Sequence, residues 1–244
     1  FSADGKAAAI VEVHSEPDFV AKNEEFINFV DTLAKMALES DAADMDAFMA
    51  LPYEGEGTVQ DALNNKIATI GENLNIRRFE KVTAEHGCVV SYTHGGGRIG
   101  VIVKADTDVV NDAVKECLSN VAMQVAALSP KYVATTDVPE DYKEHEKELL
   151  MAQAQNDPKN ANKPANIIEK MITGRLAKEL KEVCLLEQAY VKDGDLTVAK
   201  YIEQVAKENG AKLSVKKFVR FETGEGLEKK VDDFAAEVAA QAGM

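Results

Sequence analysis

An ungapped internal repeat relates two segments of this 244-residue chain, each with the pattern of a strand followed by a helix. Moving the first segment along the sequence superposes pairs of identical residues, namely Val11 and Val101, Val13 and Val103, Asp18 and Asp108, Val20 and Val110, Ala37 and Ala127, and Leu38 and Leu128. Self-similarity of this kind is typical of proteins built from related structural units. The sequence therefore predicts two similar α/β core subdomains.

Apolar periodicity predicts the elements of the first subdomain. Residues 7–14 have the apolar, β-rich composition of a strand that ends before Pro17. Residues 18–39 repeat apolar side chains at helical spacing, with Asp18 as a possible N-cap. Residues 59–74 are also predicted to be helical, and a β-like segment follows them.

The second subdomain is predicted to contain a hairpin of strands. Strands at 88–93 and 98–103 flank a glycine-rich turn that begins at His94. A helix is expected at 108–128, and a later helix at 198–209 precedes an alternating strand at 213–221. Because the strands are expected to pair antiparallel and the helices are separate from them, the predicted fold class is α+β.

Residues 140–186 differ in character, because Pro158 and Pro164 separate two helical stretches. Their apolar positions predict an antiparallel helical hairpin, or coiled coil, whose apolar seam could pack on itself or on a partner. A terminal amphipathic helix is expected at 228–242. The expected domains are 1–84 for the N-terminal subdomain, 85–139 and 189–227 for the two parts of the C-terminal subdomain, 140–188 for the inserted hairpin and 228–244 for a C-terminal helical module.

The composition predicts a soluble, acidic protein that binds another protein. The 42 acidic side chains outnumber the 28 basic ones, and the formal charge of −14 disfavours nucleic acid as a partner. We interpret the basic residues of the last strand as a solvated face and not an RNA-binding patch; they are Lys212, Lys216, Lys217 and Arg220.

The cysteines and the hydropathy bear on the compartment. Cys88, Cys117 and Cys184 lack metal or redox spacing, which favours buried thiols in the cytosol or an organelle matrix. No apolar run approaches the length of about 20 residues that a membrane span needs, so we expect no membrane association.

No catalytic or cofactor motif stands in the right context. Residues 95–100 formally match the dinucleotide fingerprint G-x-G-x-x-G, but β-rich residues continue to Val103 where that motif needs a helix. The histidines lack metal-ligand spacing from one another and from the cysteines; they are His14, His86, His94 and His145. A Cys–His or Ser–His pair could form only through tertiary proximity. We expect no cofactor, no metal and no enzymatic activity.

The segment 17–20 is the strongest candidate for a contact with another protein. It places Phe19 at the first turn of a predicted helix, beside a loop, where full burial is not assured. Phe19 could be a hydrophobic staple or a core residue. An exposed aromatic side chain at this position would instead be a wedge for a groove on another protein.

Four segments, in this order, closely resemble the translation elongation factor Ts family: 18–23, 70–78, 94–103 and 234–239. The resemblance extends over essentially the whole chain. It implies two similar core subdomains, a protruding helical hairpin and a C-terminal helical module. The family's N-terminal helical module has no counterpart here and the chain begins at Phe1, so we expect that a segment preceding Phe1 is missing.

The resemblance also implies a function and a contact surface. Members of this family exchange guanine nucleotides on elongation factor Tu, releasing GDP so that GTP can bind. Phe19 would be the wedge near the magnesium site of Tu, and the hairpin would reach another domain of Tu or a second copy of the chain as a homodimer. The implied contact residues are Asp18, Phe19, Val20, Ile70, Gly71, His94, Phe234 and Val238.

Two other functions are kept open. A scaffold protein could keep the same core and hairpin without any exchange activity. A nucleotide-dependent enzyme could use the glycine loop, which would require a helix that begins near Gly97. The resemblance favours an exchange factor in the bacterial cytoplasm or an organelle matrix.

Overall fold

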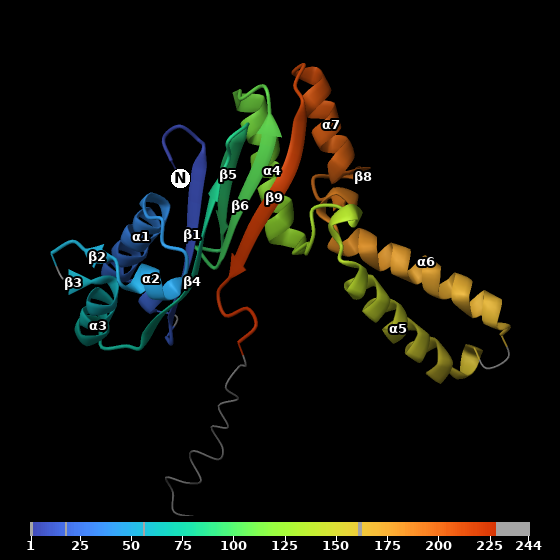
Figure 1. The fold of residues 1–244 in the computed structure, drawn as a ribbon, viewed down its shortest axis with the longest axis horizontal. Coiled ribbons are helices and arrows are strands. Elements are labelled where there is room, and N and C mark those ends of the chain that lie inside the picture. Colours follow the sequence, from blue (N-terminus) through green and yellow to red (C-terminus); the bar gives the residue numbers. More distant parts are fainter. Residues whose placement is uncertain (1, 18, 56, 161–162, 228–244) are drawn as a thin grey trace, which may run out of the picture.

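The computed structural model describes residues 2–17, 19–55, 57–160 and 163–227. Its long strands lie between two groups of helices, with a helical hairpin projecting from one side (Figure 1). The long strands are β1 (Ala7–Ser15), β4 (Leu74–Thr83), β5 (Cys88–His94), β6 (Ile99–Thr107) and β9 (Leu213–Glu222). They form two antiparallel sheets, one of β1 and β4 and one in the order β5-β6-β9.

The outer face of the β1–β4 sheet is covered by α1 (Glu24–Glu39), α2 (Met45–Met49) and α3 (Val59–Ile70). The short strands β2 (Pro52–Tyr53) and β3 (Gly57–Thr58) pair between α2 and α3. Large apolar side chains of the helices fill the space against the sheet, because every third or fourth residue of α1 faces it. The largest fully buried side chains among them are Phe29, Leu33 and Phe48.

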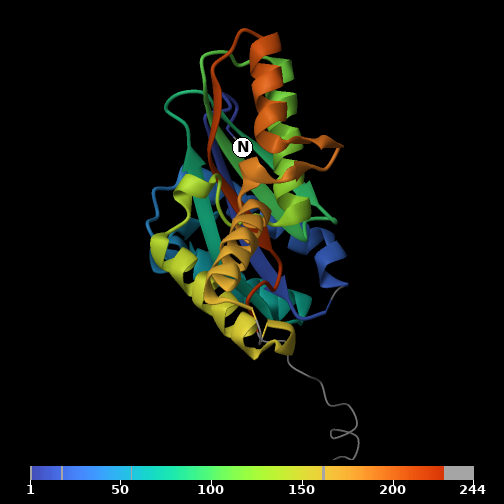
Figure 2. The same ribbon diagram turned by 90° about the vertical axis from the view of Figure 1, so that its right-hand side faces the viewer.

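The outer face of the second sheet is covered by α4 (Asp112–Leu128) and α7 (Val198–Glu208), which run side by side (Figure 2). The short strands β7 (Ala189–Tyr190) and β8 (Asp193–Thr197) precede α7. Alternate residues of β6, such as Val101 and Val103, point toward α4 and meet Leu118 and Val121.

The other residues of the strands bring the two sheets together, face to face. Ala8, Val82, Val89, Ile102 and Val219 form one buried cluster between them. The sheets approach so closely that a side chain at Gly100 would clash, since a Cβ there would lie 2.5 Å from Cδ1 of Ile10. The core is therefore a four-layer arrangement of helices, sheet, sheet and helices.

The hairpin consists of α5 (Glu140–Asn156) and α6 (Ala165–Val183), which pack against each other and extend away from the sheets (Figure 1). Leu150, Ala154 and Ile172 are buried between the two helices and form a cluster that is separate from the clusters of the core. Short 3₁₀ turns flank the hairpin at Thr135–Asp137 and Leu185–Glu187, and another lies at Pro158–Asn160 near its tip.

The α+β class with antiparallel strands is confirmed, and some predicted boundaries are wrong. The helix predicted from residue 18 begins at Glu24, where the side chain of Asn23 accepts hydrogen bonds from the N–H groups of Glu25 and Phe26. Asp18 is therefore not its N-cap. The helix predicted to reach residue 74 ends at Ile70, because Gly71 takes the left-handed conformation that ends helices. The helix expected at 228–242 lies outside the described residues.

The second helix of the repeat also begins later than predicted. Its N-cap is Asn111 and not Asp108, because the Asn111 side chain accepts a hydrogen bond from the N–H of Val114. In both halves of the repeat, then, an asparagine and not the aligned aspartate caps the helix.

Candidate functional site

The sequence predicts a set of contact residues, and those that the structure describes lie at one end of the two sheets. We call this end the contact end. There β1 ends opposite the start of β4, β5 ends opposite the start of β6, and β9 ends beside the start of β6. The contact end consists of the described residues of the segments 16–17, 19–23, 70–73, 94–98 and 223–226. Asp18, Phe234 and Val238 fall outside the described residues.

Phe19 projects from the contact end. Its side chain is 68% exposed, whereas the neighbouring Val20 is 1% exposed and belongs to the core beneath α1. A 3₁₀ turn, Val20–Lys22, holds this arrangement through hydrogen bonds from the N–H of Lys22 to the oxygen of Phe19 and from the N–H of Val20 to the oxygen of Pro17. Phe19 is thus not a core residue, and Val20 anchors the loop that presents it.

Ile70 is the last residue of α3 and Gly71 begins the turn to β4, close to the end of β1. Ser15 pairs with Leu74 across the sheet, and the side chains of Asn73 and Glu16 lie 3.4 Å apart. Ile70 is half-buried against the core beneath α1 and Gly71 is exposed. This turn therefore lies beside the loop that carries Phe19, as part of the same connection region.

His94 is exposed at the start of the glycine turn between β5 and β6. Its ring stacks on that of Tyr92, and Tyr92 Oη lies 3.1 Å from His94 Nδ1, within hydrogen-bonding distance. The glycine turn leads directly into β6 at Ile99, so the helix that a dinucleotide fingerprint requires near Gly97 is absent.

A buried carboxylate, which the sequence did not single out, lies just inside the contact end. Glu12 on β1 is 4% exposed. It accepts hydrogen bonds from Arg77 Nη1 at 3.1 Å, from Arg78 Nε and from the backbone N–H of Gly224 at 3.1 Å, and it lies against His14 Nε2. Charged side chains are rarely this buried unless they are paired, as Glu12 is here.

The surroundings of Glu12 decide its protonation. Burial by itself would raise the pKa of this carboxyl, but hydrogen bonds from His14, Gly224 N–H, Arg78 and Arg77 outweigh burial and hold the pKa below its usual range. Glu12 is therefore ionised at neutral pH. In the sequence, the feature that could have pointed to this buried charge is a lone acidic residue inside the apolar strand segment 7–13.

The same ion network continues into the turn after β9. Arg78 lies over the ring of Phe221 and its Nη2 is 3.4 Å from Glu225 Oε2. Arg220 pairs with both Glu222 and Glu225. The turn 223–226 is thereby held to β4 and β9 at once, through charge-assisted hydrogen bonds.

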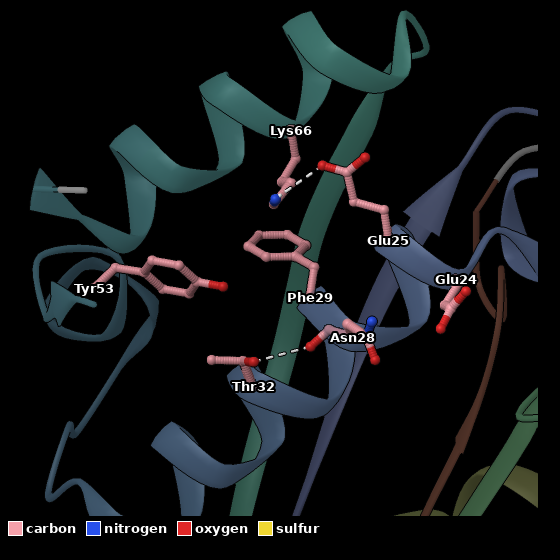
Figure 3. A pocket seen from close by; sticks show the side chains of 7 residues that line it. All are labelled: Glu24, Glu25, Asn28, Phe29, Thr32, Tyr53 and Lys66. Atoms are coloured by element: carbon pink, nitrogen blue, oxygen red, sulfur yellow. Dashed lines mark hydrogen bonds and ion pairs between the residues drawn. The ribbon is translucent and has the colours of Figure 1, made fainter. Parts of the chain in front are cut away.

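A solvent-open hollow of about 510 Å³ lies between α1 and α3 (Figure 3). Lys66 Nζ lies 3.0 Å from Glu25 Oε1 across it, and the rings of Phe29 and Tyr53 form its inner wall. The other lining residues are Glu24, Asn28 and Thr32. The lining holds no histidine or cysteine, and the hydroxyl of Thr32 donates to the backbone oxygen of Asn28 on the same helix.

The cysteines are not reactive groups. All three are buried free thiols. Burial raises the pKa of each, that of Cys117 to about 11, so they stay protonated at neutral pH. Within the described part of the chain, no group of three or more His, Cys, Asp or Glu side chains could hold a metal ion. None of the described helices combines the length and apolarity that crossing a membrane requires.

The sequence also matches a protein-family model and the sequences of known proteins. The family model described as "Elongation factor TS" matches residues 16–225. The chain is 48% identical over 242 residues to elongation factor Ts of Clostridium botulinum (strain Eklund 17B / Type B), covering 99% of this chain and 78% of that protein. It is 50% identical over 238 residues to that of Clostridioides difficile (strain 630), covering 98% and 77%.

A relative from another genus gives the same result. Elongation factor Ts of Trichlorobacter lovleyi (strain ATCC BAA-1151 / DSM 17278 / SZ) is 47% identical over 249 residues, covering 100% of this chain and 79% of that protein. The family model covers β4, β5, β6, β9 and the hairpin but begins after β1, and the alignments with the relatives extend over nearly the whole chain. The chain belongs to the elongation factor Ts family, whose members are nucleotide exchange factors and not enzymes.

Proposed function

We propose that this chain binds elongation factor Tu through its contact end and accelerates release of GDP, with Phe19 as a wedge in the nucleotide domain near the magnesium site. Val20, Ile70, Gly71 and His94 supply neighbouring contacts, together with Asp18, Phe234 and Val238. Membership of the elongation factor Ts family supports the partner and the exchange activity.

The observation that carries the wedge is the exposure of Phe19. Phe19 is 68% exposed, and its buried neighbour Val20 anchors the loop that carries it. The apolar surface of the ring is removed from water only when a partner covers it. Its anchoring also matters, because a side chain held in one place before binding loses less conformational entropy when it enters a groove.

The energy of one side chain does not suffice for exchange. A GTPase that holds GDP at nanomolar affinity has about 12 kcal/mol of binding free energy. Burying one phenylalanine contributes about 1.5–3 kcal/mol. The remaining coupling must come from a broad interface, and the contact end offers several connections that a partner can touch together.

Thermodynamic reciprocity sets the mechanism. An exchange factor that binds nucleotide-free Tu more tightly than GDP-bound Tu must lower the affinity of Tu for GDP to the same degree. The natural lever is the bound magnesium and the phosphate groups, because that ion carries the largest local charge in the site. Displacement of the groups that hold it requires no acid, base or nucleophile on this chain.

The test of the wedge is the Phe19→Ala variant in an assay of labelled-GDP release from Tu. We expect the maximal release rate to fall about tenfold, which corresponds to about 1.4 kcal/mol. Because Phe19 contributes little to the core, the thermal unfolding midpoint should stay within about 2 °C of wild type.

The matched control is Val110→Ala. Val110 is also an exposed apolar residue in a connection between a strand and a helix, but it follows β6 at the opposite end of the sheets. Its removal should leave GDP release unchanged. Normal release by the Phe19 variant would reject the wedge, and a wild-type chain that binds Tu without releasing GDP would instead indicate the scaffold role.

The domain organisation belongs to the same proposal. We infer two related core subdomains, 1–84 and 85–139 with 189–227, in which β1 with α1 corresponds to β6 with α4. The packing of each helix on the outer face of its own sheet supports this inference. The C-terminal module, 228–244, would add contacts to the nucleotide domain of Tu.

We infer that the hairpin 140–188 acts as a coiled coil that reaches another domain of Tu or a second copy of the chain. Leu149 and Ile167 support a contact role, because both are exposed on the hairpin. The acidic charge of −14 supports the absence of nucleic acid among the partners and is compatible with the cytoplasm or an organelle matrix.

A further inference from the structure

We propose that Gln124 and Gln188 are positioning residues that fix the direction of the hairpin relative to the contact end, so that the hairpin and Phe19 reach one partner together. The consequence for exchange rests on the proposed function, whereas the direction of the hairpin is a property of this chain alone. Gln124 is fully buried on α4, and Gln188 is buried directly after the 3₁₀ turn that follows the hairpin.

The two amides form a chain of hydrogen bonds from α4 to the last turn of α6. Gln124 Nε2 donates to Gln188 Oε1 at 3.2 Å and to the backbone oxygen of Ala189 at 3.0 Å. Gln188 Nε2 donates to the backbone oxygen of Glu182 at 2.7 Å. Gln124 Oε1 accepts from the N–H of Val191 at 2.8 Å. The side chain of Gln188 therefore joins a helix of the core to the end of the hairpin.

The orientation of both amides follows from their backbone partners, because a backbone N–H only donates and a backbone oxygen only accepts. The N–H of Val191 fixes which end of the Gln124 amide is the oxygen. The oxygen of Glu182 fixes the nitrogen of Gln188, which leaves Gln188 Oε1 facing Gln124 Nε2. The backbone oxygen of Gln188 also accepts from the N–H of Val198 at 3.0 Å, at the start of α7. The network thus has a single arrangement of donors and acceptors.

Apolar contacts anchor the base of the hairpin without fixing its direction. Leu185 belongs to the apolar cluster beneath α4, whereas the buried cluster inside the hairpin is separate from it. Burial of apolar surface has no directional preference, but a hydrogen bond weakens steeply when its angle is distorted. The N–H groups of Lys131 and Tyr132 donate to the oxygen of Val183, but both residues lie in the connection after α4. The amides supply a directional link from α4 itself.

The length of the hairpin amplifies a small change of angle at its base, because the hairpin extends away from the sheets (Figure 1). The 19 residues of α6 correspond to a length of about 28 Å, so a tilt of about 10° would move its far end by about 5 Å. A partner that binds the contact end and the hairpin together gains affinity only while the two sites keep the right separation. Loss of the amide link should therefore weaken binding and leave the action of Phe19 intact.

The direct test measures distances by pulsed electron paramagnetic resonance between spin labels at Ile167→Cys near the hairpin tip and Val110→Cys before α4, in the full chain. Both residues are exposed and the native cysteines are buried, so the labels attach at the two new sites. We expect a narrow distribution in the labelled parent. After Gln188→Met the distribution should shift or broaden by about 4 Å, the movement of Ile167 for a tilt of about 10°.

Gln188→Met isolates the link to the hairpin, since methionine is about as long as glutamine but lacks the amide. Gln124 keeps its bonds to Ala189 and Val191, and residue 188 keeps its backbone bond to Val198. A role in stability alone would lower the unfolding midpoint and leave the label distances of the folded chain unchanged. If Gln188→Met fails to fold, Gln188→Asn replaces it, because its shorter amide stays polar but cannot reach both partners.

The matched control is Asn120→Leu. Asn120 lies one turn before Gln124 on α4 and is also buried. Its Nδ2 donates to Tyr201 Oη at 2.8 Å, and its Oδ1 accepts from Lys192 Nζ at 2.7 Å. This variant therefore removes two polar contacts of α4 that do not reach α6. The label distances and the rate of GDP release should match those of the parent chain.

The exchange assay tests the consequence for the partner. GDP release from Tu is measured against the concentration of the unlabelled chain, which separates the half-saturating concentration from the maximal rate. We expect Gln188→Met to raise the half-saturating concentration about tenfold, because the two contacts no longer form together. The maximal rate should stay as in wild type, since Phe19 is unchanged.

The outcomes keep the positioning role and the proposed function apart. Unchanged label distances after Gln188→Met overturn the positioning role, whatever the exchange assay gives. Changed distances with an unchanged half-saturating concentration overturn its consequence for exchange. A wild-type chain without exchange activity rejects the proposed function, and the label distances then still decide whether the amides fix the direction of the hairpin.

Discussion

At the scale of single residues, Glu12 and Phe19 invert the usual distribution of side chains. The charged residue is buried and the aromatic residue is exposed, although both lie on the segment formed by β1 and the loop after it. Buried charge and exposed aromatic surface are the observations that call for an explanation in a folded protein. Here the first is explained by ion pairing inside the chain, and the second by the contact that we propose with a partner.

The ionised state of Glu12 makes stability depend on pH. Its pKa is lower in the folded chain than the usual value of 4.5, so its contribution to the free energy of unfolding is present above that value. The contribution is lost as the pH falls through the folded pKa, where the carboxyl takes up a proton and its ion pairs with Arg77 and Arg78 weaken.

We expect Glu12→Gln to be less stable than wild type at pH about 7, and the difference to shrink at pH about 3. Urea unfolding at both pH values measures it. Glu80→Gln is the comparison, because Glu80 is far more exposed than Glu12 and its ion pair with Lys217 is weakened by solvent. A stability difference for Glu12→Gln that is the same at both pH values would contradict the role of the charge.

At the scale of elements, the hairpin of α5 and α6 stands apart from the rest. Its cluster of Leu150, Ala154 and Ile172 is small and has no member in the core clusters. Segments with few buried contacts of their own open more readily than a domain core. We therefore expect the hairpin to unfold locally before the sheets do.

Ile172→Ala tests this separation. Ile172 is fully buried between the hairpin helices, so its truncation should cost about 2–5 kcal/mol. Amide hydrogen exchange should rise throughout α5 and α6 and stay unchanged in the long strands. Ile167→Ala on the same helix is the control, because Ile167 is exposed and its loss should change stability by less than about 0.5 kcal/mol. Loss of protection in β6 would show that the hairpin and core unfold together.

At the scale of the whole molecule, the two sheets behave as one packed unit. Ile102 is buried between them, where it meets side chains of both, and the side chain of Ile10 on β1 packs against Gly100 on β6. Close-packed interiors transmit the loss of a side chain to all neighbours of the cavity. The contact end can stay in one geometry only while the sheets remain together.

Ile102→Ala should therefore act on both sheets. We expect the free energy of unfolding to fall by about 2–5 kcal/mol, and amide protection to fall in β1 and β4 as much as in β5, β6 and β9. Native-state hydrogen exchange measures both effects. A loss confined to the sheet that contains Ile102 would show that the two subdomains unfold separately.

The sequence by itself determined most elements and the family. Periods of two and of about 3.6 residues are local properties, so the long strands, the longer helices and the hairpin could be predicted from apolar spacing. The short elements α2, β2, β3, β7 and β8 were not predicted, because they contain too few residues to show a period. Helix starts were less certain, because Asp18, Asp108 and the nearby asparagines are all suitable caps. The segments that resemble elongation factor Ts also pointed to contact residues, and those within the described part of the chain lie at one end of the sheets.

Only the tertiary structure decided which side chains are buried at that end of the sheets. Whether Phe19 is a core residue or a projecting one depends on where α1 and its core place Val20. The ionised Glu12 depends on Gly224, 212 residues away, and on two arginines brought to it by the pairing of β1 with β4. Burial and charge pairing are set by neighbours in space, and a sequence pattern records only neighbours along the chain.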